Sequence, residues 1–269
     1  MIRMPIAPLA AIAAVLAFHA PARAESVKVN GIELHYDVQG SGEPLIMLHG
    51  FLECSSLWKP VVPELAKKYR VITVDLRGHG RSTNPSNQFS HPQSAEDIRA
   101  LMDGLNISQA RAVGFSSGGM TLLRLATKYP ERLSKMVVVG ATTHFPEQAR
   151  AMIRGVSMES LPPPLLGTFR NCATRGDAQV KELLAQFANF ANTTDDMNLT
   201  PADLAKVKAD TLIIHGDRDE FFPVAIPVAM YGAIPKAALW IVPGGDHSPS
   251  AGAKREEFVE EVGEFLAKK

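Results

Sequence analysis

The chain has 269 residues, of which 46% are hydrophobic and 21% are charged, as in an ordinary globular protein with a sizeable core. Its 28 basic and 28 acidic residues give a formal net charge of +0 at pH 7, so the charge balance does not indicate a nucleic acid or another polyanionic partner. The length fits one large α/β domain with an inserted subdomain.

The first 24 residues have the composition of a secretory signal peptide. A short basic start precedes an apolar stretch over residues 6–18, and residues 22–24 supply a small-x-small cleavage pattern. The stretch contains Pro8 and is too short to span the ~30 Å apolar layer of a membrane. We therefore expect a signal peptide over residues 1–24, removed on export to the periplasm or the medium, with no stable membrane anchor left on the mature chain.

The first half of the chain predicts a hairpin followed by buried strands. Residues 27–29 and 32–36 flank an Asn-Gly dipeptide, which is typical of a tight hairpin turn. The continuous apolar runs 45–48 and 71–74 are typical of strands that are covered on both faces of a sheet.

Helices are predicted between and after these strands. Apolar periodicity predicts a helix over residues 57–69. The spacing Ser94-x-x-Asp97 is that of a capping box, which predicts that another helix begins at Ser94. Strand and helix patterns then continue to the apolar strand 136–139, and this alternation predicts a parallel sheet with right-handed crossovers.

After residue 140 the alternation is interrupted. Residues 142–206 contain two helical patches separated by three consecutive prolines, and 65 residues are too many for a plain loop. Strand and helix patterns then resume to the end of the chain. We therefore predict a core formed by residues 25–141 and 207–269, and a helical cap formed by residues 142–206.

A Gly-x-Ser-x-Gly pentapeptide, residues 114–118, lies between an apolar strand and a helical segment. In this setting the pentapeptide is typical of a nucleophile elbow, a strained turn that presents a serine hydroxyl at the end of the sheet. Residues two before and two after that serine must be small, and here they are Gly114 and Gly118. The pattern predicts Ser116 as a nucleophile.

A serine hydroxyl needs a histidine base that is oriented by a buried carboxylate. Asp217 and Asp219 follow the apolar strand 211–214 and are both candidates for the acid. His247 follows the last strand and a Gly-Gly pair, which is the place expected for the base. The chain order is then serine, aspartate, histidine.

Together these motifs resemble the α/β-hydrolase superfamily over essentially the whole mature chain. The resemblance implies a mostly parallel, eight-stranded sheet with helices on both faces and an inserted helical cap. It also implies that Asp219 is the acid, while Asp217 stabilises its turn. The oxyanion hole is expected to use the backbone N–H groups of Ser117 and of Phe51, in a His-Gly-x loop where His49 holds the loop.

Residues 75–82 also resemble the family's stretch after the fourth strand, which shapes the fold around the site, although their basic side chains could instead bind an anionic substrate. Leu161, Leu165 and Phe169 are candidates for lining an acyl pocket or for packing inside the cap. Cys54 and Cys172 could form a disulfide, which export permits, or stay unpaired.

The eight histidines show no metal-ligand spacing, and the chain has no dinucleotide or phosphate-loop fingerprint, so no metal or cofactor is expected. We expect an exported serine hydrolase that cleaves a carboxylic ester, thioester or lactone of a small-molecule substrate. Ser116 excludes haloalkane dehalogenases and epoxide hydrolases, which carry aspartate there. The alternatives are an aminopeptidase, a cofactor-free perhydrolase, a carbon–carbon bond hydrolase, or a binding receptor on the same scaffold. The oligomeric state stays open.

Overall fold

The computed structural model describes residues 23–250 and 252–268. The predicted signal peptide therefore lies outside the described residues, apart from Arg23 and Ala24, which begin the first strand. Within the part of the chain that the structure describes, no helix combines the length and the apolar character needed to cross a membrane.

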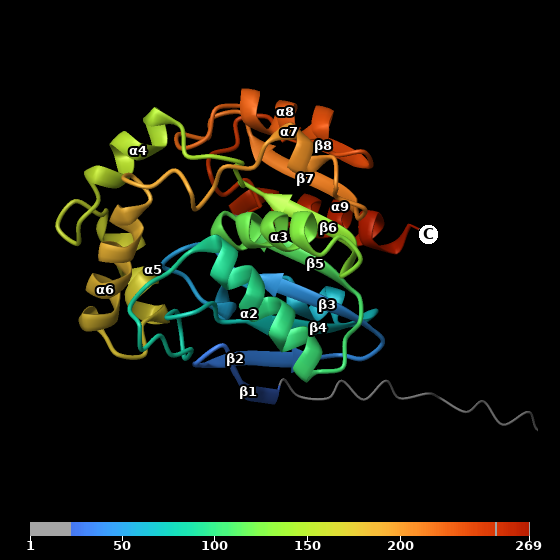
Figure 1. The fold of residues 1–269 in the computed structure, drawn as a ribbon, viewed down its shortest axis with the longest axis horizontal. Helices are drawn as coiled ribbons and strands as arrows, with labels where there is room; N and C mark the ends of the chain where they lie inside the picture. The colour runs from blue at the N-terminus through green and yellow to red at the C-terminus, as the bar shows by residue number, and fades with distance from the viewer. Residues whose placement is uncertain (1–22, 251, 269) are drawn as a thin grey trace, which may run out of the picture.

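A single eight-stranded sheet forms the centre of the molecule (Figure 1). Its order is β1-β2-β4-β3-β5-β6-β7-β8, in which the β1–β2 and β2–β4 pairs are antiparallel and the other five pairs are parallel. The predicted hairpin and the mostly parallel sheet are confirmed. The strands are β1 (Arg23–Val29), β2 (Ile32–Gln39), β3 (Glu43–Leu48), β4 (Tyr69–Val74), β5 (Ala110–Phe115), β6 (Leu133–Val139), β7 (Asp210–Gly216) and β8 (Ala237–Val242).

Helices cover both faces of the sheet, because alternate residues of each buried strand point to opposite sides. In β3, Ile46 and Leu48 join the apolar core under α2, α3 and α8, whereas Leu45 and Met47 join the core under α1 and α9. These helices are α1 (Val62–Leu65), α2 (His91–Gly104), α3 (Ser117–Lys128), α8 (Ala225–Ala233) and α9 (Arg255–Ala267), with short 3-10 turns η1 (Ser55–Trp58) and η2 (Gly252–Lys254).

Two predicted helix boundaries are wrong. The helix α2 does not begin at Ser94 but at His91, and its N-cap is Ser90, whose side chain accepts a hydrogen bond from the Gln93 N–H. The carboxylate of Asp97 does not cap the helix; it pairs with Arg77. The helix predicted over residues 57–69 is replaced by η1 and the single turn α1, since prolines within it lack the N–H that a continuous helix requires.

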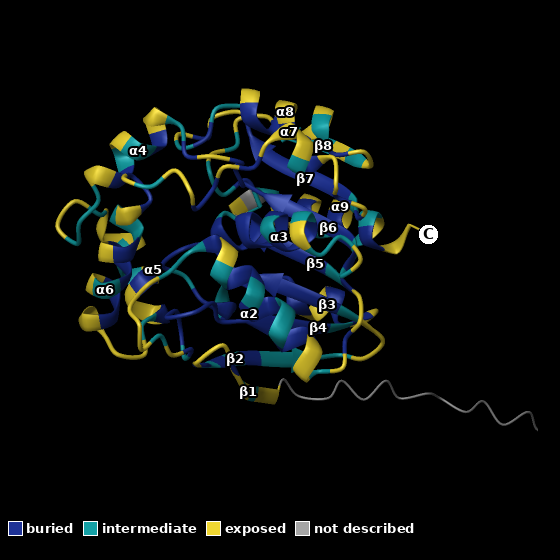
Figure 2. Cartoon of the chain, viewed as in Figure 1, coloured by how far each residue is buried: buried dark blue, intermediate teal, exposed yellow. Residues whose placement is uncertain are grey.

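Four helices lie between β6 and β7, and three of them are grouped beyond one end of the sheet (Figure 1). They are α4 (Glu147–Arg154), α5 (Pro163–Cys172), α6 (Asp177–Asn189) and the single turn α7 (Pro201–Leu204). Buried side chains of this segment, Phe190 among them, belong to the same apolar cluster as α2 and α3. Figure 2 shows this inner side buried and the outer side exposed. The division into core and cap at residues 142 and 206 stays a prediction.

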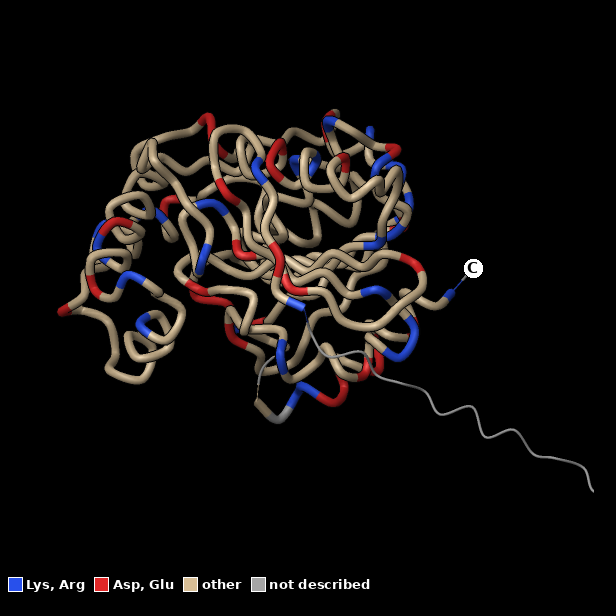
Figure 3. Tube along the Cα trace, turned by 90° about the horizontal axis from the view of Figure 1, so that it is seen from below, with Lys and Arg blue, Asp and Glu red and all other residues tan. Residues whose placement is uncertain are grey.

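Charged residues of both signs are interspersed over the surface (Figure 3). Many of them form exposed pairs, such as Arg99 with Asp103 on α2 and Arg170 with Asp177 between α5 and α6. Exposed pairs of this kind contribute little to stability, typically about 0–1 kcal/mol each. The apolar cores therefore hold the fold together, and the charges keep its surface solvated.

Candidate active site

Ser116 lies in the sharp turn between β5 and α3, with backbone angles of φ 49° and ψ −115°. A non-glycine residue adopts such a positive φ only when its surroundings enforce it. The enforcing contacts are close: a Cβ added to Gly118 would lie 2.3 Å from the Leu48 carbonyl oxygen, and one added to Gly114 would lie 2.5 Å from the Gly118 backbone. The two glycines therefore allow the elbow that the sequence predicts.

The structure brings the three predicted catalytic residues into one hydrogen-bonded chain. His247 Nε2 lies 3.1 Å from Ser116 Oγ, and His247 Nδ1 lies 2.9 Å from Asp219 Oδ2. Asp219 follows β7 and His247 follows β8, so neighbouring parallel strands deliver both residues to the same edge of the sheet as the elbow. In the neutral tautomer that donates from Nδ1 to Asp219, Nε2 is free to accept the serine proton.

The carboxylate of Asp219 is fully buried and fixed from both sides. Its Oδ1 accepts hydrogen bonds from the N–H groups of Phe221 and Phe222, at 2.8 and 3.0 Å. Burial alone raises the pKa of a carboxyl, but the hydrogen bond and charge of His247 and the backbone bond from Phe222 together hold the pKa of Asp219 below its ordinary value. Asp219 is therefore an anion wherever the fold is intact near neutral pH.

His215 is a neighbour of the acid that the sequence analysis missed. Its Nε2 lies 2.8 Å from the Phe222 carbonyl oxygen and 3.5 Å from Asp219 Oδ2. Burial lowers the pKa of His215, which keeps the ring neutral and makes Nε2 a donor to Phe222. The ring thus supports the turn that carries Asp219. Its place on a buried strand directly before the Gly-Asp-x-Asp loop was the available signal.

Asp217 occupies the structural position that the resemblance implied. Its Oδ1 accepts a hydrogen bond from the Gly244 N–H at 2.7 Å, and the Arg218 N–H donates to the Gly245 carbonyl at 2.8 Å. These bonds tie the loop of the acid to the loop of His247. Asp217 does not contact His247 in the hydrogen bonds that the structure describes.

The residues predicted to supply the oxyanion hole lie on both sides of Ser116. Strand β3 pairs directly with β5, so the loop that contains Phe51 emerges beside the elbow, and both Phe51 and Ser117 line the same cavity as Ser116. His49 holds this loop: its Nδ1 donates to the Gly50 carbonyl at 2.7 Å and its Nε2 accepts from the Leu76 N–H at 2.9 Å. The role of the Phe51 and Ser117 N–H groups as oxyanion donors stays a prediction.

A second serine–histidine–aspartate chain lies beneath the elbow. His91 Nε2 lies 3.1 Å from Ser117 Oγ, His91 Nδ1 is hydrogen-bonded to Asp196 Oδ2, and Asp196 Oδ1 accepts from the His91 N–H at 2.7 Å. All three residues are buried. Arg124 fixes the segment of Asp196 by donating to its backbone carbonyl. No pattern in the sequence indicates this network, because its members are separated by long stretches of chain and match no motif.

The triad opens into an apolar cavity of about 240 Å³ between the sheet and the cap. Seven of the chain's 12 phenylalanines line it, together with aliphatic side chains of α4 and α5. Leu161, Leu165 and Phe169, the candidates from the sequence, all lie in its wall. One acidic residue, Glu53, also lines the cavity beside Ser116 and His247. Burial raises the pKa of Glu53 to about 7, although the Gly50 N–H and His247 oppose that rise.

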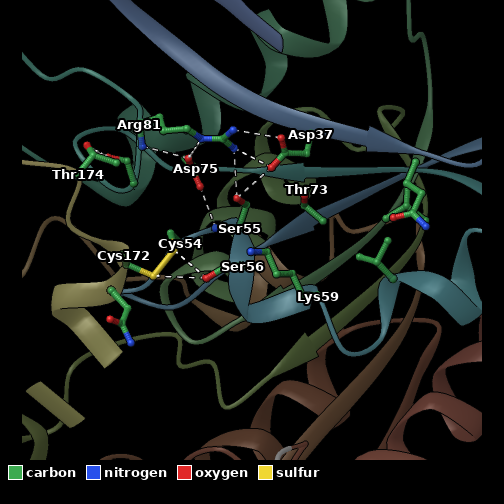
Figure 4. A pocket seen from close by; sticks show the side chains of 15 residues that line it. Asp37, Cys54, Ser55, Ser56, Lys59, Thr73, Asp75, Arg81, Cys172 and Thr174 are labelled. Carbon is green, nitrogen blue, oxygen red and sulfur yellow. Dashed lines mark hydrogen bonds and ion pairs between the residues drawn. A yellow bond between two sulfur atoms is a disulfide. The ribbon is translucent and has the colours of Figure 1, made fainter. Parts of the chain in front are cut away.

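Cys54 and Cys172 form a disulfide, which decides between the two alternatives left by the sequence. The bond joins the segment just after the Phe51 loop to the last residue of α5 (Figure 4). It lines a second, larger and more polar cavity of about 590 Å³. In that wall Arg81 donates to Asp37 and Asp75.

The basic side chains of residues 75–82 are thus occupied by the protein itself. Arg81 pairs with Asp37 and Asp75, and Arg77 forms a buried pair with Asp97. Neither arginine lines the cavity of the triad. This geometry favours the structural role of the stretch over the binding of an anionic substrate. Among the described residues, no group of three histidine, cysteine or acidic side chains is arranged to hold a metal ion.

Comparison with known proteins agrees with this architecture. Residues 43–161 match the family described as the alpha/beta hydrolase fold. The chain is 28% identical to a 2-hydroxymuconate semialdehyde hydrolase of Pseudomonas sp., covering 88% of this chain and 91% of the other. It is also 28% identical to a pimeloyl-[acyl-carrier protein] methyl ester esterase of Nitrosomonas europaea, covering 80% and 93%. The crystal structure of an enol-lactonase from Burkholderia xenovorans superposes with a TM-score of 0.76 at 24% identity, covering 91% and 100%.

The described residues therefore have the α/β-hydrolase fold, and residues 43–161 match the family model of that name. Several of the similar proteins are named as hydrolases or esterases, which supports a hydrolytic enzyme.

Proposed function

We propose that this protein is an exported serine hydrolase that cleaves a carboxylic ester, thioester or lactone through an acyl-enzyme on Ser116. The observation that carries the proposal is the continuous hydrogen-bonded chain from Ser116 through His247 to Asp219, at one end of an apolar cavity. No part of that chain is missing or turned away, as it would be in a binding protein that had lost catalysis.

In the acylation step, His247 Nε2 accepts the proton of Ser116 Oγ while that oxygen forms a bond to the substrate carbonyl carbon. The imidazolium is stabilised by the anionic Asp219, whose second oxygen is already engaged by two backbone N–H groups and cannot turn away. His247 then gives the proton to the leaving alcohol or thiol as the tetrahedral intermediate collapses. Water attacks the acyl-enzyme by the same route and restores Ser116.

The N–H groups of Ser117 and Phe51 are the proposed donors to the oxyanion of both tetrahedral intermediates. Preorganised donors of this kind each contribute about 3–4 kcal/mol of transition-state stabilisation. Three described features support the preorganisation of these donors. Ser117 is the first residue of α3, its side chain is buried, and the two hydrogen bonds of His49 hold the loop that contains Phe51.

The names of two similar proteins support an acyl substrate with an ester or lactone bond, since one is a methyl ester esterase and one is an enol-lactonase. The apolar wall of the cavity agrees with a largely hydrocarbon acyl group. A cavity of about 240 Å³ favours a small molecule over a protein chain.

Two features support export. Residues 1–24, which lie mostly outside the described part, have the pattern of a signal peptide. The Cys54–Cys172 disulfide is of a kind that persists in the periplasm and outside the cell and is rare in the reducing cytosol. Mass spectrometry of the protein purified from the periplasm or medium tests this point: the expected N-terminus is Glu25, and a full-length chain in the cytosol would contradict it.

A fluorophosphonate probe and a short p-nitrophenyl ester test the catalytic proposal together. The mature protein should be labelled on Ser116 and should turn the ester over. Ser116→Ala should abolish labelling and lower kcat by about 10⁴-fold or more without changing the circular dichroism spectrum. Ser160→Ala, an exposed serine of the cap, is the matched control and should behave as wild type. Ligand binding without labelling or turnover would instead indicate a receptor on this scaffold.

A further inference from the structure

The charge inside the active-site cavity is unbalanced. Among the described residues that line it, Glu53 is the one carboxyl group, and no lysine or arginine accompanies it. The other polar lining groups are serines and His247. Acidic side chains in apolar surroundings are normally paired, so a lone carboxyl beside the nucleophile calls for a partner that is not part of the protein.

The carboxyl of Glu53 is positioned rather than free to leave the cavity. Its Oε2 accepts a hydrogen bond from the Gly50 N–H at 3.0 Å. A Cβ added to Gly50 would lie 2.7 Å from the same oxygen, so the absence of a side chain there lets the carboxyl approach the loop backbone. Within the described residues this is the one hydrogen bond that the carboxyl accepts, which leaves its second oxygen available to a bound molecule.

Aromatic rings line the same cavity as this carboxyl group and the reacting atoms. Seven phenylalanines line the cavity, and the rings of Phe221 and Phe115 lie 4.9 and 5.4 Å from the His247 ring, centroid to centroid. The negative face of an aromatic ring attracts a cation, and rings of this kind form the cages that recognise quaternary ammonium groups. A cavity that holds an anion and is lined by several phenylalanines is therefore a suitable environment for an ammonium group.

We propose that the substrate is an ester that carries an ammonium group, with this cation held between Glu53 and the phenylalanine rings of the cavity. The inference rests on the proposed serine hydrolase function and adds the charge of its substrate. An ammonium group would supply the missing counter-charge and favour the ionised form of Glu53, which burial otherwise opposes. The cation can belong to the acyl side or to the alcohol side of the ester, and both use the same chemistry.

Two pairs of substrates show whether the cation belongs to the acyl side or to the alcohol side. The two esters of each pair are alike in shape but differ in charge. Acetylcholine and its uncharged counterpart 3,3-dimethylbutyl acetate test the alcohol side. The methyl esters of 4-(trimethylammonio)butanoate and of 5,5-dimethylhexanoate test the acyl side. Within a pair, the ratio of kcat/KM for the charged ester to that for the neutral ester is measured at about pH 8, where the ammonium groups are permanently charged and Glu53 is ionised.

The ratio is then compared between wild type and Glu53→Gln, a variant that keeps an oxygen to accept the Gly50 N–H and removes the charge. For at least one pair, the ratio should fall by about tenfold or more in the variant, as expected for the loss of a desolvated ion contact. Intrinsic reactivity of the esters cancels in this comparison. Glu64→Gln, an exposed glutamate on α1, is the control and should leave both ratios unchanged.

The failures are distinguishable. If wild type turns over no ester and Ser116 resists the fluorophosphonate, the serine hydrolase proposal fails first. If wild type turns esters over but Glu53→Gln leaves both ratios unchanged, the ammonium proposal is wrong. An equal loss on the charged and neutral esters would also overturn it, because Glu53 would then act on His247 and not on the substrate.

Discussion

His91 Nε2 lies 3.1 Å from the hydroxyl oxygen of Ser117, the residue that follows the proposed nucleophile. The same imidazole is bonded through Nδ1 to Asp196, in the segment where the chain returns from the cap to the core. The elbow and the return segment are thus joined through one buried ring. Because both ring nitrogens are engaged and none of the three residues is exposed, the contact fixes the orientation of all of them.

Replacing this ring should destabilise the fold. His91→Leu removes the ring N–H that faces the buried Asp196 carboxylate and keeps the backbone N–H; a hydrogen bond to a charged group is worth about 1.5–3 kcal/mol. We expect a loss of about 2 kcal/mol in the free energy of unfolding, measured by urea denaturation. Combining His91→Leu with Asp196→Asn should recover part of the loss, because the uncompensated charge is removed. Additive losses in the double variant would contradict a direct bond.

The carboxylate of Asp219 should be irreplaceable by an amide. Its Oδ1 accepts two backbone N–H groups, so in Asp219→Asn the amide oxygen takes that place and the NH₂ group faces His247. His247 Nδ1 must then accept a hydrogen bond from that NH₂ group, so the ring proton lies on Nε2, which can no longer act as a base. We expect kcat to fall by about 10⁴-fold, measured in a steady-state ester assay.

Asp217→Asn is the matched control for that variant. The side chain of Asp217 accepts one hydrogen bond, from the Gly244 N–H, and an amide oxygen can accept it equally well. The kcat should stay within a few-fold of wild type. A collapse of activity in Asp217→Asn with full activity in Asp219→Asn would reverse the assignment of the acid.

Glu53 should make stability depend on pH with a defined sign. Burial raises the pKa of Glu53 in the folded state to about 7, from a value of 4.5 when unperturbed, so the folded state binds more protons than the unfolded state between these values. The contribution of Glu53 to the free energy of unfolding is fully present below about pH 4.5 and is lost as the pH rises through about 7. Glu53→Gln lacks this loss, and should become more stable than wild type as the pH rises.

Thermal melts of both proteins between about pH 4 and pH 9 measure this difference. The melting temperature of Glu53→Gln minus that of wild type should increase from pH 4.5 to 7 and then level off, because other groups titrate alike in the two proteins. A difference that is constant over the whole range would show that Glu53 ionises as it does in water.

A methyl group added at Gly118 should disrupt the elbow. In Gly118→Ala the new Cβ would lie 2.3 Å from the Leu48 carbonyl oxygen, a backbone atom that cannot rotate away. We expect a loss of at least about 3 kcal/mol in unfolding free energy, or no soluble protein. Gly167→Ala in α5 meets nothing within 4 Å and replaces a helical glycine, so it should gain about 0.5–1 kcal/mol. Equal stability of the two variants would contradict the described packing.

The disulfide should be a large part of the stability. It closes a loop of 118 residues, and restricting the unfolded chain by such a loop is worth about 4–5 kcal/mol in the chain-entropy description. The variant Cys54→Ala/Cys172→Ala should melt well below wild type. A reductant should lower the melting temperature of wild type and leave that of the double variant unchanged. Insensitivity of wild type to the reductant would contradict a structural bond.

The parts of the fold that were predictable are those governed by local rules. Buried strands appear as apolar runs, and the elbow needs glycine two residues either side of Ser116, so both are visible in the sequence. The start of α2 was missed because Ser94 and Asp97 mimic a capping box. Asp97 instead pairs with the buried Arg77 and accepts a hydrogen bond from Asn30, which lies 67 residues away in the β1–β2 turn.

The parts that were not predictable depend on contacts between distant segments. His91 and Asp196 are 105 residues apart, and no spacing indicates that they meet. Glu53 resembles an ordinary loop glutamate in the sequence, but in the fold it lines a cavity together with phenylalanines of the cap. Neither periodicity nor motif reports such burial, because the covering atoms come from another part of the chain.

The cap is attached to the core at more than its two ends. Its two ends follow β6 and precede β7. On the far side of the cavity, the Cys54–Cys172 disulfide joins the cap to the loop after β3. The Gln179 side chain also donates hydrogen bonds to the Gly78 and Gly80 carbonyls. The cap is therefore attached to the core on both sides of the cavity and is not hinged on one side. A cap attached in this way cannot open to admit a larger substrate, so the enzyme should discriminate sharply by substrate size. Removing one of these attachments should broaden the range of esters that the enzyme accepts.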